Sequence, residues 1–119
     1  MRAVPCVLIV DRSAESREVL RTILESRGAA TLEADRPEQA IPLADRYQPD
    51  LIVLDADSDQ STGAATENLR EVAGRTATPI VILGTLPRPN GEVPPGQIVA
   101  KPYHYGQLLR KIDDLLAAA

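Results

Sequence analysis

The stretch Pro49-Asp50-Leu51-Ile52-Val53-Leu54-Asp55 decides the fold of this chain. Its middle is an unbroken aliphatic run with an aspartate at each end, which is the pattern of a short strand buried on both faces. Such a strand needs helices on both faces of its sheet. Amphipathic helical patterns precede and follow the stretch in the sequence, so it predicts a parallel sheet enclosed by helices.

Similar apolar runs recur along the 119 residues. We expect strands at 4–10, 29–34, 51–54, 79–83 and 98–100, and helices at 14–27, 36–48, 64–72 and 105–116. Ser13 and Asp35 are the expected N-caps of the first two helices, Val19 should belong to the apolar side of the first, and Pro42 should bend the second. The alternation predicts right-handed βαβ units in an α/β, doubly wound sheet of five parallel strands.

Composition excludes several classes of protein. The net charge of −4 argues against nucleic-acid binding, which needs a basic face. The apolar run at 7–10 is too short for a signal peptide, and no segment is apolar enough to cross a membrane, so we expect a cytoplasmic protein. We expect residues 1–119 to form one domain, and the alanine-rich end is equally compatible with a domain excised from a longer chain.

Polar and small residues follow four of the expected strands. These residues are Asp11, Asp55, Gly84 and Lys101. Because the carboxyl ends of parallel strands meet at one edge of a doubly wound sheet, the four positions should converge there. Carboxylate oxygens suit magnesium, and an ammonium group can neutralise a phosphoryl group, so the edge indicates a cation and phosphate site.

The motifs that carry this pattern are Val7-Leu8-Ile9-Val10-Asp11, the stretch at 49–55, Gly63, Pro79-Ile80-Val81-Ile82-Leu83 and Lys101-Pro102-Tyr103. In this order and spacing the chain resembles the receiver domain of bacterial two-component systems. The resemblance implies a flavodoxin-like sheet in the order 2-1-3-4-5, and an aspartate that accepts phosphate from a histidine kinase with the help of magnesium. It implies that Asp55 is the acceptor, that Lys101 contacts the phosphate, and that Asp11 is the first of an acidic pair.

The chain departs from the family pattern at the positions that carry its chemistry. The second acid of the pair is Arg12, whose guanidinium could pair bidentately with Asp11 or Asp55. The usual Thr or Ser is Gly84, and the usual switch aromatic is Ile98. A Pro/Gly-rich loop at 86–96 replaces the fourth helix of the family. Asp57 is the one change that adds a carboxylate beside the pocket.

These departures predict a pseudo-receiver, a regulatory module that acts by protein contact without normal magnesium-dependent phosphorylation of Asp55. The expected partners are a histidine kinase, including a hybrid kinase that contains the domain, or neighbouring receiver domains. We expect no enzymatic activity and no bound metal. The vestigial pocket then consists of Asp11, Arg12, Asp55, Asp57, Gly84 and Lys101.

Two alternatives stay open at this point. Arg88, Tyr103 and Arg110 supply the guanidinium and aromatic groups that suit a cyclic dinucleotide such as cyclic diguanylate, which predicts a second-messenger sensor. Alternatively, the Asp57 carboxylate replaces the lost metal ligand, and Asp55 is phosphorylated in an atypical receiver.

Overall fold

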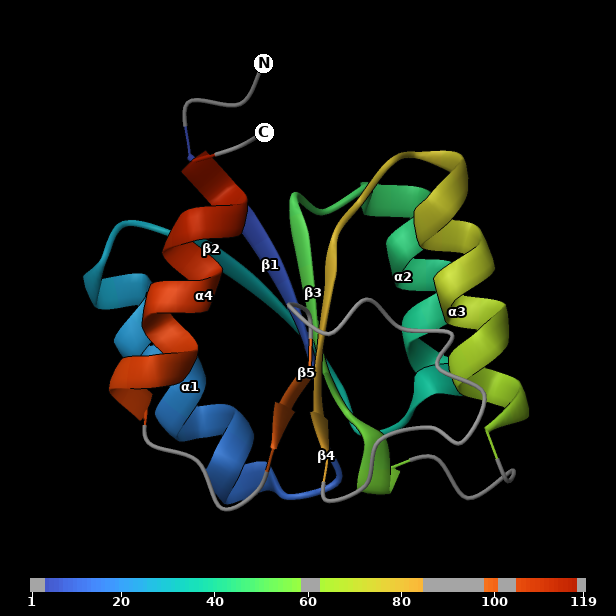
Figure 1. Cartoon of the computed structure of the whole chain (residues 1–119), viewed down its shortest axis with the longest axis horizontal. Coiled ribbons are helices and arrows are strands. Elements are labelled where there is room, and N and C mark those ends of the chain that lie inside the picture. Colours follow the sequence, from blue (N-terminus) through green and yellow to red (C-terminus); the bar gives the residue numbers. More distant parts are fainter. Residues whose placement is uncertain (1–3, 59–62, 85–97, 101–104, 118–119) are drawn as a thin grey trace.

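The fold is a three-layer α/β arrangement, seen here in a computed structural model that describes residues 4–58, 63–84, 98–100 and 105–117. Helices α1 and α4 cover one face of a parallel sheet, and α2 and α3 cover the other (Figure 1). The strands are β1 (Cys6–Val10), β2 (Ala30–Ala34), β3 (Leu51–Asp55), β4 (Ile80–Gly84) and β5 (Ile98–Ala100), and the helices are α1 (Ala14–Ser26), α2 (Pro37–Tyr47), α3 (Ala64–Arg75) and α4 (Tyr105–Ala117), with a short 3₁₀ turn η1 (Ala56–Ser58). The prediction of an α/β fold with a parallel sheet is confirmed.

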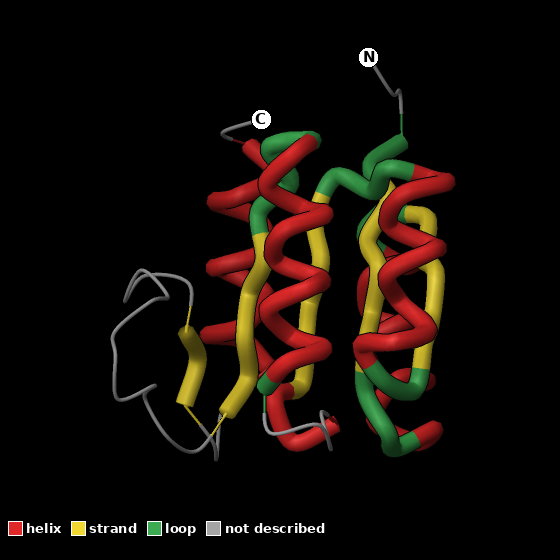
Figure 2. Tube along the Cα trace, turned by 90° about the vertical axis from the view of Figure 1, so that its right-hand side faces the viewer, coloured by secondary structure: helices red, strands yellow, loops and turns green. Residues whose placement is uncertain are grey.

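The strands lie in the order β2-β1-β3-β4-β5, so the chain reverses its direction of winding between β2 and β3. All strands run parallel, and their carboxyl ends point to the same edge of the sheet (Figure 2). Of the expected loop at 86–96, and of the Lys101-Pro102 peptide, the structure says nothing, because both lie outside the described residues.

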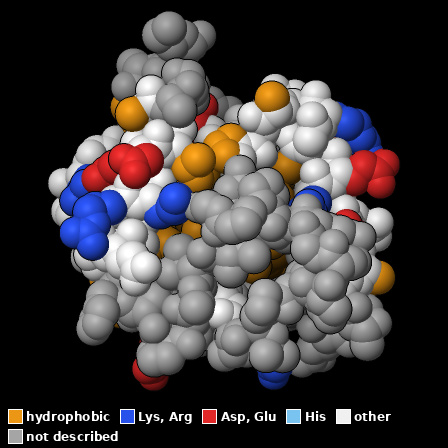
Figure 3. Space-filling model, in the orientation of Figure 1, with side chains coloured by type: hydrophobic (Ala, Val, Ile, Leu, Met, Phe, Trp, Pro, Cys, Tyr) orange, Lys and Arg blue, Asp and Glu red, His pale blue; other side chains and the backbone are white. Residues whose placement is uncertain are grey.

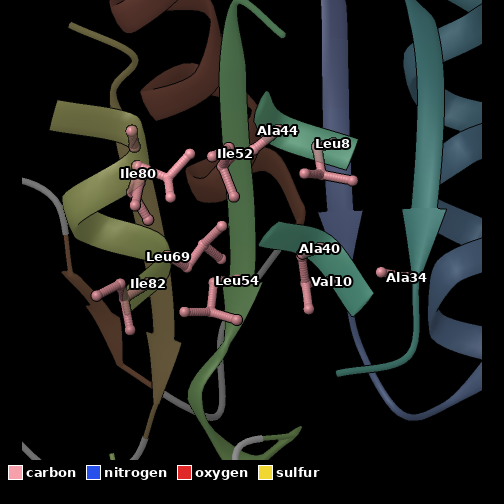
Figure 4. Packing of buried hydrophobic residues seen from close by; sticks show 12 residues of the cluster. Leu8, Val10, Ala34, Ala40, Ala44, Ile52, Leu54, Leu69, Ile80 and Ile82 are labelled. Atoms are coloured by element: carbon pink, nitrogen blue, oxygen red, sulfur yellow. The ribbon is translucent and has the colours of Figure 1, made fainter. Parts of the chain in front are cut away.

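Strands β1 and β3 supply the centre of the core. Residues 7–10 and 51–54 are at most 1% exposed, as the unbroken aliphatic runs predict. Alternate residues face opposite layers: Leu8, Val10, Ile52 and Leu54 pack in one cluster with α2 and α3, to which α3 contributes Leu69 (Figure 4). Val7, Ile9, Leu51 and Val53 pack with α1 and α4. Each fully buried aliphatic side chain contributes about 1.5–3 kcal/mol, so this double layer dominates the stability.

Helix α1 begins and ends at the residues that its sequence predicts. The Ser13 hydroxyl oxygen accepts the Ser16 amide at 3.2 Å, which confirms Ser13 as the N-cap. At the other end Gly28 has φ of 91°, and the Gly28 and Ala29 amides donate to the carbonyls of Glu25 and Leu24. This is a Schellman motif, which favours glycine because of the positive φ. Val19, in contrast, is 42% exposed, so its expected place on the apolar side is wrong.

Helix α2 begins one residue later than the expected capping would place it. Arg36 is the N-cap residue and makes no side-chain capping hydrogen bond, so the prediction of Asp35 as the cap is wrong. The reason is Pro37, whose fixed φ and missing amide favour the first helical position, which makes the preceding residue the cap. The helix is continuous through Pro42, which is exposed; the bend expected there stays a prediction.

Candidate functional site

The candidate site lies at the carboxyl edge of the sheet, where β1, β3 and β4 end side by side (Figures 1 and 2). Val10 is paired with Leu54, so the residues that come next, Asp11 and Asp55, lie at the same level on adjacent chain segments. Asp55 is paired with Leu83, which places Gly84 one residue beyond it. The structure therefore brings together three of the predicted positions, and the fourth, Lys101, lies outside the described residues.

Asp55 is the last residue of β3 and is only 7% exposed. One of its carboxylate oxygens, Oδ1, accepts the Asp57 amide at 3.0 Å. Its carbonyl oxygen accepts the hydroxyl of the buried Ser58 at 2.6 Å. These two hydrogen bonds fold η1 back onto the strand end, so that the loop after β3 is held by Asp55 itself. Such a carboxylate is a turn-forming group as well as a potential acceptor.

Asp11 is held as firmly at the end of β1. Its amide donates to the Ala34 carbonyl of β2 at 3.0 Å, and its carboxylate Oδ1 accepts the Ser13 amide at 2.8 Å. The Arg17 Nη1 atom donates to the Asp11 carbonyl at 2.6 Å. The turn from Asp11 to Ser13 is thus fixed by the backbone and the side chain of its first residue.

Arg12 lies at the exposed corner of that turn. Among the described residues no ion pair joins it to Asp11 or Asp55, so the expected bidentate pairing is not formed there. The physical reason is the hydrogen bond from the Ser13 amide to Asp11, which closes the turn and leaves Arg12 in solvent. The side chain at this position contributes neither a carboxylate nor a bridging cation to the described part of the pocket.

Gly84 lies against the loop that follows Asp55. A Cβ atom added at Gly84 would be 3.3 Å from the Ala56 Cβ atom, a tight contact that requires a small shift. The absence of a side chain at position 84 therefore matches the local packing. Ile98 begins β5, and the structure describes its backbone only.

The remaining carboxylate of the pocket belongs to Asp57, which is exposed in η1. Within the described residues no three His, Cys, Asp or Glu side chains are grouped closely enough to hold a metal ion. The donor set at this edge also does not fit the magnesium site that the receiver resemblance implies. The residue beside Asp11, where the resemblance implies a second acidic ligand, is the cationic Arg12.

Of the three residues expected to contact a cyclic dinucleotide, one lies in the described part of the chain. Arg110 is exposed on α4, whereas Arg88 and Tyr103 lie outside the described residues. In the face shown in Figure 3, basic side chains lie beside acidic ones on both flanks, and hydrophobic side chains gather between them. Binding of cyclic diguanylate stays a prediction.

The described helices include none that is long and apolar enough to cross a membrane.

The sequence reasoning missed an ionic cluster beside the pocket. Glu33 of β2 accepts Arg17 Nε at 3.2 Å through Oε1 and Arg21 Nη1 at 3.1 Å through Oε2. The cluster borders a hollow of about 210 Å³ that Ala34, Asp35 and Gln39 also line. Its signal in the sequence is a pair of arginines four residues apart on one helix, opposite a glutamate in the following strand.

Comparison with known proteins is consistent with this architecture. Residues 7–90 match the family described as the response regulator receiver domain. The transcriptional regulatory protein YdfI of Bacillus subtilis is 35% identical over 81 residues, which is 66% of this chain and 37% of that protein. KdpE, the KDP operon transcriptional regulatory protein of Escherichia coli, is 27% identical over 111 residues, or 89% of this chain and 48% of that protein. The chain spans less than half the length of the curated relatives it matches.

Solved structures agree on the fold. The chemotaxis protein CheY4 of Vibrio cholerae has a TM-score of 0.75 at 22% identity, with 95% of this chain and 99% of that chain covered. The signal receiver domain of an HD domain-containing protein from Pseudomonas fluorescens has a TM-score of 0.79 at 20% identity, with 99% and 90% covered. At these identities the likeness is one of fold.

Proposed function

The chain belongs to the family of response regulator receiver domains, and we propose that it is a pseudo-receiver, which regulates by protein contact without ordinary magnesium-dependent phosphorylation of Asp55. Its role in two-component signalling follows from the family. The proposal concerns how this member works. The proposed partner is a histidine kinase or a neighbouring receiver domain. This partner can be a separate protein or another part of a longer protein that contains this domain.

The observation that carries the proposal is the exposed Arg12 beside Asp11. At this position the receiver resemblance implies an acid that binds magnesium directly. A guanidinium cannot bind a cation, and it adds positive charge where the ion would enter. Magnesium contributes several kcal/mol to phosphoryl transfer, and a loss of about 4 kcal/mol slows a reaction roughly a thousandfold.

The packing supports a role that depends on shape. Residues 7–10 of β1 and 51–54 of β3 are fully buried, and the turns after these strands are held by hydrogen bonds to Asp11 and Asp55. A partner that recognises these loops would meet one preformed surface, and preformed surfaces bind with a smaller entropic loss. The fixed turns after β1 and β3 therefore support a function in binding a partner protein.

Incubation of the chain with acetyl phosphate and Mg²⁺, followed by intact-mass measurement, tests the proposal. We expect no phosphoryl adduct beyond the level of the Asp55→Asn variant, which lacks the acceptor carboxylate. A receiver of ordinary activity, treated in parallel, shows that the donor is competent. An adduct on the wild-type chain that disappears in Asp55→Asn and on chelation of Mg²⁺ would contradict the proposal.

A second candidate is favoured by the position of Asp57. Its amide is bonded to Asp55, and its exposed side chain adds a carboxylate two residues from the acceptor. This candidate is an atypical receiver in which Asp57 assists the metal. It predicts a wild-type adduct that Asp57→Asn abolishes and Asp59→Asn, a change at the next acidic residue, does not.

A further inference from the structure

We infer that Arg17 is a positioning residue, which holds the Asp11 turn in one conformation without the aid of a divalent ion. The inference rests on the proposed function, because it explains how the rim of a pocket without an ordinary metal site keeps its shape. The observation behind it is that one guanidinium joins three elements of the chain: α1, the end of β1, and β2.

Arg17 uses two different guanidinium nitrogens to contact two acceptors on different elements. Nη1 donates to the Asp11 carbonyl at 2.6 Å, and Nε donates to Glu33 Oε1 at 3.2 Å. The Arg17 side chain is only 19% exposed, so both bonds are partly shielded from water. A planar guanidinium can satisfy two acceptors in fixed directions at once, whereas a lysine ammonium is a single point.

Arg21 provides a built-in comparison. It lies one helical turn after Arg17 and donates to the other carboxylate oxygen of Glu33, at 3.1 Å. It has no hydrogen bond to Asp11 among the described residues, and its side chain is 40% exposed. The two arginines therefore share the ion pair with β2, and only Arg17 extends it to the pocket.

The charge of the cluster supports the same role. Two guanidinium groups face one carboxylate, so Arg17, Arg21 and Glu33 together carry one net positive charge next to the turn. The Asp11 carboxylate, which accepts the Ser13 amide, thus lies on a turn whose carbonyl is already bound by a cationic side chain. The carbonyl at the start of the turn is therefore held by a cationic side chain of the chain itself.

Amide hydrogen exchange tests the inference on the folded chain. The Asp11 and Ser13 amides report on the turn, and the Val53 amide in the core reports on global opening. Because a hydrogen bond to a charged group is equivalent to about 10- to 100-fold in an equilibrium constant, Arg17→Met should accelerate exchange at Asp11 and Ser13 by that factor relative to Val53. Arg21→Met should leave this ratio unchanged.

Arg17→Lys completes the test and serves if Arg17→Met does not fold. It keeps the charge and removes the fork, so we expect the exchange at Asp11 and Ser13 to stay fast relative to Val53. Equal ratios in the Arg17 and Arg21 variants, or full recovery in Arg17→Lys, would overturn the inference. These outcomes are independent of the phosphoryl adduct, which tests the proposed function alone.

Discussion

The core of the sheet and the rim at its carboxyl edge differ sharply in the kind of side chain they carry. Residues 7–10 and 51–54 fill the centre of the molecule with unbroken aliphatic packing. One residue further along, β1 leads into Asp11 and the exposed Arg12, and β4 ends in Gly84. The change from buried aliphatic packing to polar or absent side chains takes place within two residues of each strand's buried run.

This difference shows that the two regions answer to different physical demands. The core must fill volume, and any loss of aliphatic area weakens the whole domain. Arg12 at the rim is exposed, so a substitution at this position can change the chemistry with little effect on folding. The fold of this chain is therefore compatible with a cationic residue at position 12.

The largest effect on stability should come from truncating a side chain in the core, which tests the difference between core and rim directly. Leu54→Ala removes a fully buried side chain between β3 and the α2/α3 layer, so we expect a loss of about 2–5 kcal/mol in the free energy of unfolding. Chemical denaturation measures it. Val19→Ala, at a 42% exposed position, is the matched control and should change stability by less than about 0.5 kcal/mol. Similar losses in both variants would contradict the assignment of the core.

Restoring an acid at the rim should change chemistry and not stability. Arg12→Asp returns the second carboxylate beside Asp11, so we expect the rate of magnesium-dependent phosphorylation by acetyl phosphate to rise by about tenfold or more, equivalent to at least ~1.4 kcal/mol. The rate of adduct formation measures this effect. Arg12→Asn removes the charge without adding an acid and is the control. If Arg12→Asn gained as much as Arg12→Asp, loss of the guanidinium alone would be the cause.

Substitutions at the C-terminal ends of α1 and α3, near the amino edge of the sheet, should have the smallest effect on stability. They provide a reference for the core and rim variants. Helices α1 and α3 both end in Schellman motifs, with Gly28 at φ of 91° in one and Ala77 at φ of 55° in the other. A left-handed conformation costs a residue with a Cβ about 1–2 kcal/mol, partly offset by the unfolded-state entropy of glycine. Ala77→Gly should therefore stabilise the chain by about 0.5 kcal/mol.

Gly28→Ala is the reverse change at the equivalent position. No atom lies within 4 Å of a Cβ added at Gly28, so its expected loss of about 1 kcal/mol is purely conformational. Thermal and chemical unfolding measure the change in the free energy of unfolding of each variant. Opposite signs are expected, and a loss in Ala77→Gly would show that the backbone at position 77 is not the limiting factor.

The fold was predictable from the sequence because its signals are local. The apolar runs at 7–10, 51–54 and 80–83 are long enough to identify buried strands, and Ser13 and Gly28 mark the ends of α1. The capping of α2 was mispredicted because Asp35 is a strong N-cap residue, while Pro37 sets the start of the helix instead. Val19 was misassigned because helical spacing alone does not distinguish a position at the margin of the apolar stripe.

The site was predictable only in part. Strand order places Asp11, Asp55 and Gly84 at one edge, and this follows from parallel topology. The orientation of Arg12 depends on a turn closed by the Ser13 amide, and the role of Arg17 depends on a contact between helix and strand end. Neither is encoded in spacing, since both arise from how the chain turns between elements.

A Mg²⁺ titration followed through amide chemical shifts tests the central claim, that this rim does not bind magnesium as a receiver ordinarily does. For the wild-type chain we predict no saturable shift at the Asp11, Asp55 and Asp57 amides, and for Arg12→Asp a saturable shift centred on the same residues. A saturable, chelator-reversible shift at those amides in the wild-type chain would contradict the account.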